Sequence, residues 1–143
     1  MSKRKQRGFT LIEIMVVVII IGLLATMVLP KVIGRQEQAL QVRAKTDVRT
    51  ISQALELYKL DNFNYPATQE GLGALVSKPG SAKNWQKGGY LNSKSVPKDP
   101  WGNDYQYRRP GKNGEFDLWS HGADGKDGGT DENKDIGNWN LDD

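Results

Sequence analysis

The chain has 143 residues, of which 37% are hydrophobic and none is cysteine, so it can bury one modest core but can form neither a disulfide framework nor a thiolate metal site. Its net charge of +3 comes from the first residues, because Lys3, Arg4, Lys5 and Arg7 leave 16 Lys and Arg against 17 Asp and Glu over residues 9–143. The nearly neutral remainder gives no support to a function in binding nucleic acid.

A long apolar segment follows the basic residues. From Phe9 to Leu29 the chain carries a single charge, on Glu13. As a helix, this segment spans roughly 31 Å, about the thickness of the hydrocarbon core of a bilayer. The basic residues favour a cytoplasmic N-terminus and place the remainder of the chain across the membrane. The run is longer than that of an ordinary secretory signal and no A-x-A pattern follows it, whereas a plain single-span anchor remains open.

Glu13 is the residue that a plain anchor leaves unexplained. An acid at the centre of a membrane span costs about 2.5–3.5 kcal/mol, and less near an end, so it is expected to have a partner. Arg7 precedes the segment and Lys31 lies beyond its opposite end, so neither is an obvious partner within the chain. The remaining simple partner is a group on another chain.

The stretch RGFTLIEIMVVVIIIGLLA resembles the N-terminal signal of type IV pilins and pseudopilins. The resemblance implies that a leader, residues 1–8, is cleaved between Gly8 and Phe9 by an inner-membrane prepilin peptidase, and that Phe9 is then N-methylated. It also implies that residues 9–30 are retained as a transmembrane helix that forms the core of a filament. In the family, the acid at the position of Glu13 pairs with the N-terminal amine of a neighbouring subunit during assembly.

Residues 31–60 are predicted to form an amphipathic helix with one face against a globular layer. Apolar side chains recur there at spacings of three and four, at Leu40, Ala44, Val48, Ile51, Leu55 and Tyr58. Pro30 is expected to kink or interrupt the helix before this stripe. Further on, TQEGLGALV is compatible with a short helix capped by Thr68, and residues 77–100 are predicted to be irregular because they are rich in Gly, Pro, Ser and Lys.

The C-terminal third is predicted to contain an antiparallel hairpin. Residues 103–109 alternate tyrosine with polar residues, GEFDLWSHG places Phe116, Leu118 and Ser120 on one face, and PGKNG between them is typical of a turn. A long helix followed by a small antiparallel sheet is an α+β fold. The stretches YPATQEGLGALV, DPWGNDYQYRRPG and FDLWSHGADGKDGG resemble the major pseudopilins of type II secretion systems, which implies that residues 31–143 form a periplasmic body.

An acidic, glycine-rich stretch, HGADGKDGGTDENKDIGNW, follows the hairpin. Its carboxylates are hard oxygen ligands of the kind that calcium takes, although the spacing is not that of an EF-hand and a solvated acidic tail is an equally simple interpretation. The pseudopilin resemblance favours calcium. It implies that Asp124 and Asp131 are side-chain ligands and that the backbone carbonyl of His121 contributes to the shell. With no cysteine to close a disulfide, this metal would clamp the C-terminal loop.

No catalytic constellation is evident, so the chain is predicted not to be an enzyme. Ser120 and His121 are adjacent, and neighbours on a strand point to opposite faces. The predicted function is therefore structural: a subunit of the periplasmic pseudopilus that drives export of folded proteins by type II secretion, or alternatively the major subunit of a surface type IV pilus. The implied partners are copies of the same chain, minor pseudopilins, the prepilin peptidase, the inner-membrane assembly platform and the membrane itself.

Overall fold

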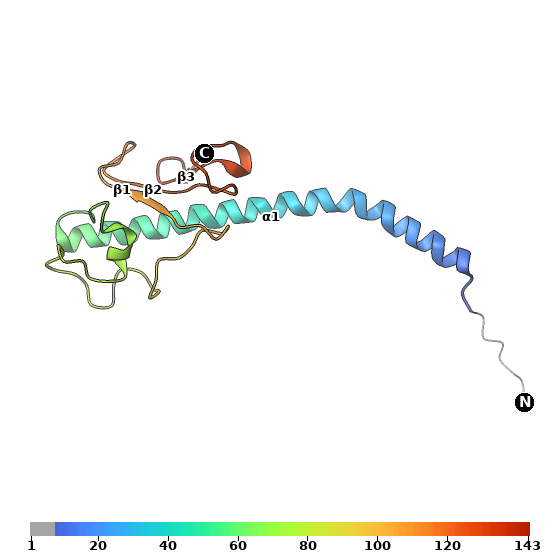
Figure 1. Cartoon of the computed structure of the whole chain (residues 1–143), viewed down its shortest axis with the longest axis horizontal. Coiled ribbons are helices and arrows are strands. Elements are labelled where there is room, and N and C mark those ends of the chain that lie inside the picture. Colours follow the sequence, from blue (N-terminus) through green and yellow to red (C-terminus); the bar gives the residue numbers. More distant parts are fainter. Residues whose placement is uncertain (1–7) are drawn as a thin grey trace, which may run out of the picture. The chain divides into compact units, whose positions relative to one another are not determined.

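The computed structural model describes residues 8–143, and at residues 29–31 the backbone alone. Except for Gly8, the predicted leader lies outside the described residues. The chain divides into two compact units, one ending at Gln36 and the other running from Glu37 to Asp143. One helix, α1 (Leu11–Asn62), belongs to both units and continues through Pro30 (Figure 1). Of the kink or interruption predicted at Pro30, the interruption is therefore wrong. A proline removes one backbone donor, and the intact turns on either side retain their own hydrogen bonds.

The unit from Glu37 to Asp143 holds a hydrophobic core between the C-terminal half of α1 and the elements that follow (Figure 1). The apolar stripe of the helix forms one side of this core, as predicted, except that Leu40 at its start is only half-buried. Leu118 and Phe116 face the helix from the sheet region, and Leu72 and Leu75 close the core from the loop side. All the buried apolar side chains of the described residues lie in this unit, so the body contains its own core.

The sheet has three antiparallel strands in the order β1 (Gln106–Arg108), β2 (Asp117–Ser120) and β3 (Ile136–Gly137). The predicted hairpin is β1–β2, with Tyr107 opposite Leu118. The third strand was not predicted, because two residues are too few to show the alternation of apolar and polar side chains that indicates a strand. It pairs with β2 through Ser120 opposite Ile136 and thereby brings the two ends of the acidic stretch together.

The region between α1 and the sheet contains only one short element, the 3-10 helix η1 (Gly71–Leu75). Residues 77–100 form no helix or strand apart from a single bridge at Lys98, as predicted. The prediction that Thr68 caps the short helix is wrong: Glu70 occupies the cap position without a side-chain hydrogen bond. The Thr68 hydroxyl instead donates to the backbone oxygen of Arg109 and accepts from its amide, both at 2.8 Å. One long helix packed on a small antiparallel sheet confirms the α+β class.

Candidate functional site

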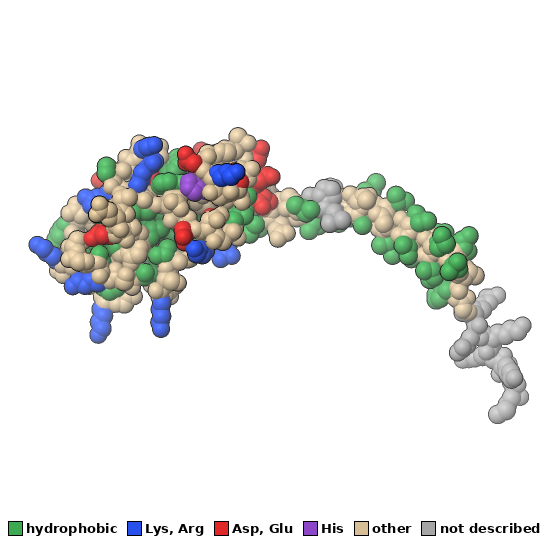
Figure 2. Space-filling model, in the orientation of Figure 1, with side chains coloured by type: hydrophobic (Ala, Val, Ile, Leu, Met, Phe, Trp, Pro, Cys, Tyr) green, Lys and Arg blue, Asp and Glu red, His purple; other side chains and the backbone are tan. Residues whose placement is uncertain are grey.

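The N-terminal part of α1 presents apolar side chains on every side. Each side chain from residue 11 to residue 28 is exposed, and Figure 2 shows hydrophobic groups gathered along this segment. By length and composition the helix could cross a membrane, with a mean hydropathy of 2.9 over an 18-residue window of which nothing is buried. Gly8 and Phe9 precede the helix without regular secondary structure, and 81% of Phe9 is exposed. The predicted cleavage point is therefore an accessible peptide bond in this structure.

Glu13 has a partner inside the chain that the sequence analysis missed. The Glu13 amide donates to Thr10 Oγ1 at 3.3 Å, and the Thr10 amide donates to Glu13 Oε2 at 3.5 Å. This reciprocal pair is a capping box, which satisfies two of the free amides at the start of α1. The local pattern Thr-x-x-Glu before an apolar run was the available signal. The cap uses one carboxylate oxygen in a long hydrogen bond of 3.5 Å, and among the described residues Glu13 forms no ion pair.

The acidic loop, which we define as residues 121–135, begins at a buried polar anchor. Ser120 is fully buried, and its hydroxyl donates to Asp99 Oδ2 at 2.6 Å and accepts from the Gly122 amide at 3.1 Å. Asp99 Oδ1 in turn accepts from the amides of Trp101 and Asn103. Because buried polar groups need partners, this network fixes where the loop leaves β2.

His121, Asp127 and Asp135 come together in the acidic loop. Their candidate ligand atoms all lie within 4.8 Å of one another, and His121 Nδ1 is 3.3 Å from Asp135 Oδ1. The second oxygen of Asp135 accepts from the Gly128 amide at 3.0 Å. His121 and Asp135 are half-buried and Asp127 is exposed. Of the three residues, only His121 is predicted as a ligand from the sequence, and there through its backbone carbonyl.

The two predicted calcium ligands lie elsewhere in the same loop. Asp124 is exposed, and its Oδ1 accepts from the Lys126 amide at 3.0 Å in a local turn. Asp131 is exposed at the start of the 3-10 helix η2 (Asp131–Asn133), with a φ of 52°, and its backbone oxygen accepts from Gln41 Nε2 at 3.2 Å. The carboxylates of Asp124 and Asp131 are not part of the three-residue cluster.

Backbone carbonyls of the loop converge on Gly122. A methyl group placed there would lie 2.9 Å from the Lys134 oxygen and 3.0 Å from the Glu132 oxygen, at a φ of +71° that side chains rarely adopt. The Glu132 oxygen also accepts from the Ala123 amide at 3.0 Å. The loop thus carries backbone carbonyl oxygens together with exposed carboxylates, a donor set that fits calcium in kind.

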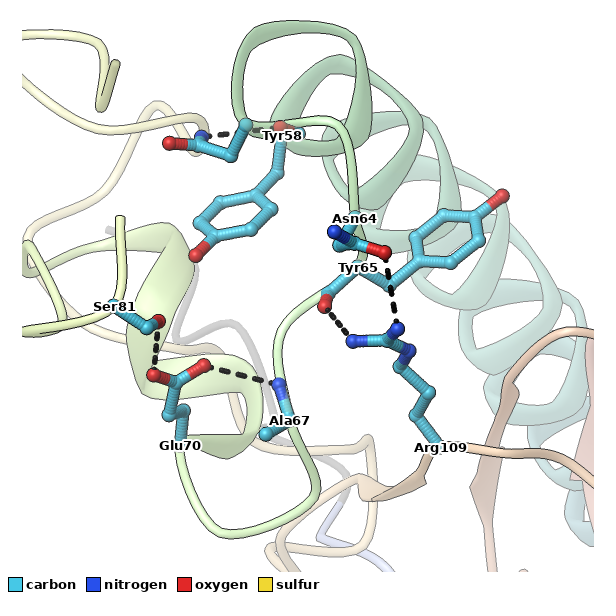
Figure 3. Close-up of a pocket in the computed structure, with 8 residues that line it drawn as sticks. Tyr58, Asn64, Tyr65, Ala67, Glu70, Ser81 and Arg109 are labelled. Atoms are coloured by element: carbon cyan, nitrogen blue, oxygen red, sulfur yellow. Dashed lines mark hydrogen bonds between the residues drawn. The ribbon is translucent and has the colours of Figure 1, made fainter. Parts of the chain in front are cut away.

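A separate pocket of about 260 Å³ lies near the end of α1 (Figure 3). Arg109 Nη1 donates to the Tyr65 backbone oxygen at 2.7 Å, and Glu70 accepts from the Ser81 hydroxyl. Burial, followed by the hydrogen bond to Glu56, raises the pKa of the Tyr65 hydroxyl. Through these hydrogen bonds, Arg109 and Glu70 hold neighbouring segments of the chain together. We therefore assign this pocket a structural role.

Comparisons with known proteins agree over both parts of the chain. Residues 31–139 match the family model described as type II secretion system, protein G, and residues 3–29 match the prokaryotic N-terminal methylation motif. Type II secretion system core protein G of Pseudomonas aeruginosa is 59% identical over 142 residues, which cover 97% of this chain and 99% of the relative. Core protein G of Vibrio cholerae is 53% identical over 142 residues, covering 98% and 96% respectively.

A solved structure is also similar. The crystal structure of the major pseudopilin from the type 2 secretion system of enterohaemorrhagic Escherichia coli matches with a TM-score of 0.64 and 39% identity, covering 75% of this chain and 92% of that chain. The match spans the same helix-and-sheet arrangement that forms the body here. Both the family model and the relatives extend over most of the chain. The chain therefore belongs to the protein G family of type II secretion systems.

Proposed function

We propose that this chain is the major structural subunit of a periplasmic pseudopilus and that its polymerisation drives export of folded proteins by type II secretion. The observation that carries the proposal is that the apolar half of α1 buries no residue of its own, while the body has a separate core. A helix that is hydrophobic all round is stable only in lipid or among other apolar helices. A filament subunit needs both environments in turn, first the membrane and then its neighbours.

The membrane topology that we propose follows from the same segment. The apolar half of α1 crosses the bacterial inner membrane once, and the body lies in the periplasm because the basic N-terminal residues stay in the cytoplasm. The proposed partners are other copies of the chain, minor pseudopilins, the prepilin peptidase and the inner-membrane assembly platform. A surface type IV pilus is the second candidate, and the secretion names of the relatives favour the first.

Deleting the gene separates these two functions. Secreted enzymes and surface pili are measured in the same cells, with the gene restored on a plasmid as the control. Loss of secretion with surface pili retained supports the pseudopilus. Normal secretion with surface pili lost would show that the chain is instead a pilin.

Processing at Gly8–Phe9 is the first specific prediction. The match to the methylation motif and the accessible, irregular chain before α1 support cleavage between these residues. Mass spectrometry of the membrane fraction is expected to find a chain that begins at N-methylated Phe9. A chain that still begins at Met1 would identify a plain membrane anchor and contradict the filament proposal.

We also propose that the acidic loop holds a calcium ion through Asp124 and Asp131. The loop supplies free carboxylates and converging carbonyls, and glycines such as Gly122 give it a backbone that bends closely around an ion. The backbone carbonyl of His121 is a further donor that we propose. When bound, calcium neutralises clustered carboxylates that otherwise repel one another, and it ties the loop to the sheet.

Removing calcium is expected to lower the melting temperature of the body, residues 34–143. Binding to the folded state alone stabilises it by about 2.7 kcal/mol at a hundredfold excess over Kd. Calcium should restore melting better than magnesium, which demands a tight octahedral shell. Asp124→Ala and Asp131→Ala should each abolish the response, whereas Asp127→Ala should keep most of it. Melting that is indifferent to chelator and calcium alike would leave the loop as a solvated tail.

A further inference from the structure

The side chains of His121, Asp127 and Asp135 form a cluster that the calcium proposal does not use. The strand register creates this cluster. Ser120 pairs with Ile136, so the next residues outward, His121 and Asp135, lie opposite each other just after β2 ends and just before β3 begins. Residues directly opposite on antiparallel strands have closely spaced side chains. The strand register therefore brings the two residues close together.

Both groups are also oriented by neighbours. Asp135 Oδ2 accepts a hydrogen bond from the Gly128 amide. This bond orients the carboxylate so that its other oxygen, Oδ1, points toward His121 Nδ1. The backbone oxygen of Asp135 accepts from Asn140 Nδ2 at 3.0 Å, which fixes the residue at the entry to β3. The His121 ring meets the Trp119 ring edge to face, with centroids 5.9 Å apart. Orientation of ligands by surrounding hydrogen bonds and packing is a feature of metal sites in proteins.

We propose that His121, Asp127 and Asp135 bind a first-row transition metal ion of the Zn²⁺ type, at a site separate from Asp124 and Asp131. An imidazole nitrogen with two carboxylates is a donor set that suits zinc, whereas calcium takes oxygen donors. Tetrahedral zinc with bonds of roughly 2.0–2.1 Å places neighbouring ligand atoms about 3.3 Å apart. The distance between His121 Nδ1 and Asp135 Oδ1 is 3.3 Å, which equals the spacing expected for two ligands of one tetrahedral zinc ion.

Asp127 completes the site from the loop side. Its side chain is exposed, so it can approach the other two ligands without unpacking the core. Three protein ligands leave a fourth position for water. Because Asp127 and Gly128 are adjacent, an ion held there would tie the glycine-rich part of the loop to the edge of the sheet. The site would then give the loop a second attachment that does not need calcium.

The experiment uses the full chain in detergent micelles, without a histidine tag. Because His121 is the only histidine, its imidazole nitrogen signals in a ¹H–¹⁵N spectrum are unambiguous. Adding one equivalent of zinc to the chain already saturated with calcium is expected to shift them. Asp127→Asn and Asp135→Asn should each weaken zinc binding at least about tenfold in calorimetric titration, because both remove a direct ligand. Asparagine at 135 keeps an acceptor for the Gly128 amide, and Asp127 is exposed, so both variants should fold.

Asp124→Asn is the matched control in the same loop. It should bind zinc with an affinity within about twofold of the wild type while losing the calcium response, so failure of the calcium proposal and failure of this one give different results. Histidine signals that zinc leaves unmoved would overturn the site. So would a loss of zinc affinity in Asp124→Asn as large as that in Asp135→Asn, because the ion would then lie at the predicted calcium ligands.

Discussion

Replacing Glu13 with glutamine is expected to stop filament assembly while leaving the folded body and its membrane insertion intact. Glutamine preserves the capping box with Thr10, since either Glu or Gln serves at this position, but it removes the charge. If the carboxylate pairs with a neighbouring amine in an apolar environment, losing one partner costs about 2–5 kcal/mol per contact. That loss corresponds to a roughly 30-fold or greater weakening of subunit association. The measurements are the yield of sheared filaments and the secretion of a folded exoprotein.

Two further variants separate the charge of Glu13 from its capping role. Glu13→Ala removes both and should fail at least as completely as glutamine. Thr10→Ala removes the cap but keeps the carboxylate, so it should assemble filaments and secrete at levels near the wild type. If Glu13→Gln assembles normally and Thr10→Ala does not, then the acid is needed only to start the helix and the intersubunit pairing is wrong. The amount of each variant in the membrane fraction controls for insertion.

Replacing Asp117 with asparagine is expected to destabilise the body by about 1.5–3 kcal/mol, because two backbone amides and the Arg108 guanidinium, whose side chain is 30% exposed, lose a charged acceptor. Asp117 is fully buried. Its Oδ2 accepts from Arg108 Nη2 at 2.6 Å, from Arg108 Nε at 2.8 Å and from the Lys112 amide at 2.8 Å, and its Oδ1 accepts from the Asn113 amide at 3.1 Å. One carboxylate therefore joins β2, β1 and the turn between them. Urea unfolding of residues 34–143 measures the effect.

The same carboxylate predicts how stability depends on pH. Burial opposes ionisation of Asp117, but the Lys112 amide, the Arg108 guanidinium and the Asn113 amide together outweigh it and hold the pKa of the carboxyl below its usual value. A lowered pKa in the folded state means that the ionised group stabilises the fold above about pH 4 and that this contribution is lost as the pH falls through the folded pKa. The difference between wild type and Asp117→Asn should therefore narrow below about pH 4.

An exposed ion pair provides the control for Asp117. Arg49 Nη2 lies 2.9 Å from Asp142 Oδ1, and 97% of the Asp142 side chain is exposed. Asp142→Asn should change the stability of the body little at any pH, because solvent screens exposed pairs. Equal losses in the two asparagine variants, or a loss in Asp117→Asn that persists undiminished at pH 2, would contradict the assignment of Asp117 as a buried charged anchor.

Features that depend on local composition or on the spacing of apolar residues along the chain were predictable from the sequence. The apolar segment after the basic residues, the helical stripe that ends at Tyr58 and the hairpin around PGKNG each depend on residues close together in the chain. The capping box of Thr10 and Glu13 is equally local, because the pattern Thr-x-x-Glu before an apolar run encodes it. In all these cases the physical cause lies in one continuous stretch of the chain.

Contacts between distant segments were decided only by the tertiary structure. Strand β3 has two residues and no pattern of its own, yet its pairing with β2 sets His121 opposite Asp135. Thr68 bonds to the backbone of Arg109, 41 residues away, and so does not cap the nearby helix. The sequence shows that the acidic loop contains several carboxylates that could bind a metal. It does not show which of these carboxylates lie close together. Strand register and the folding of the chain over its core determine that, since they fix which side chains share one small volume.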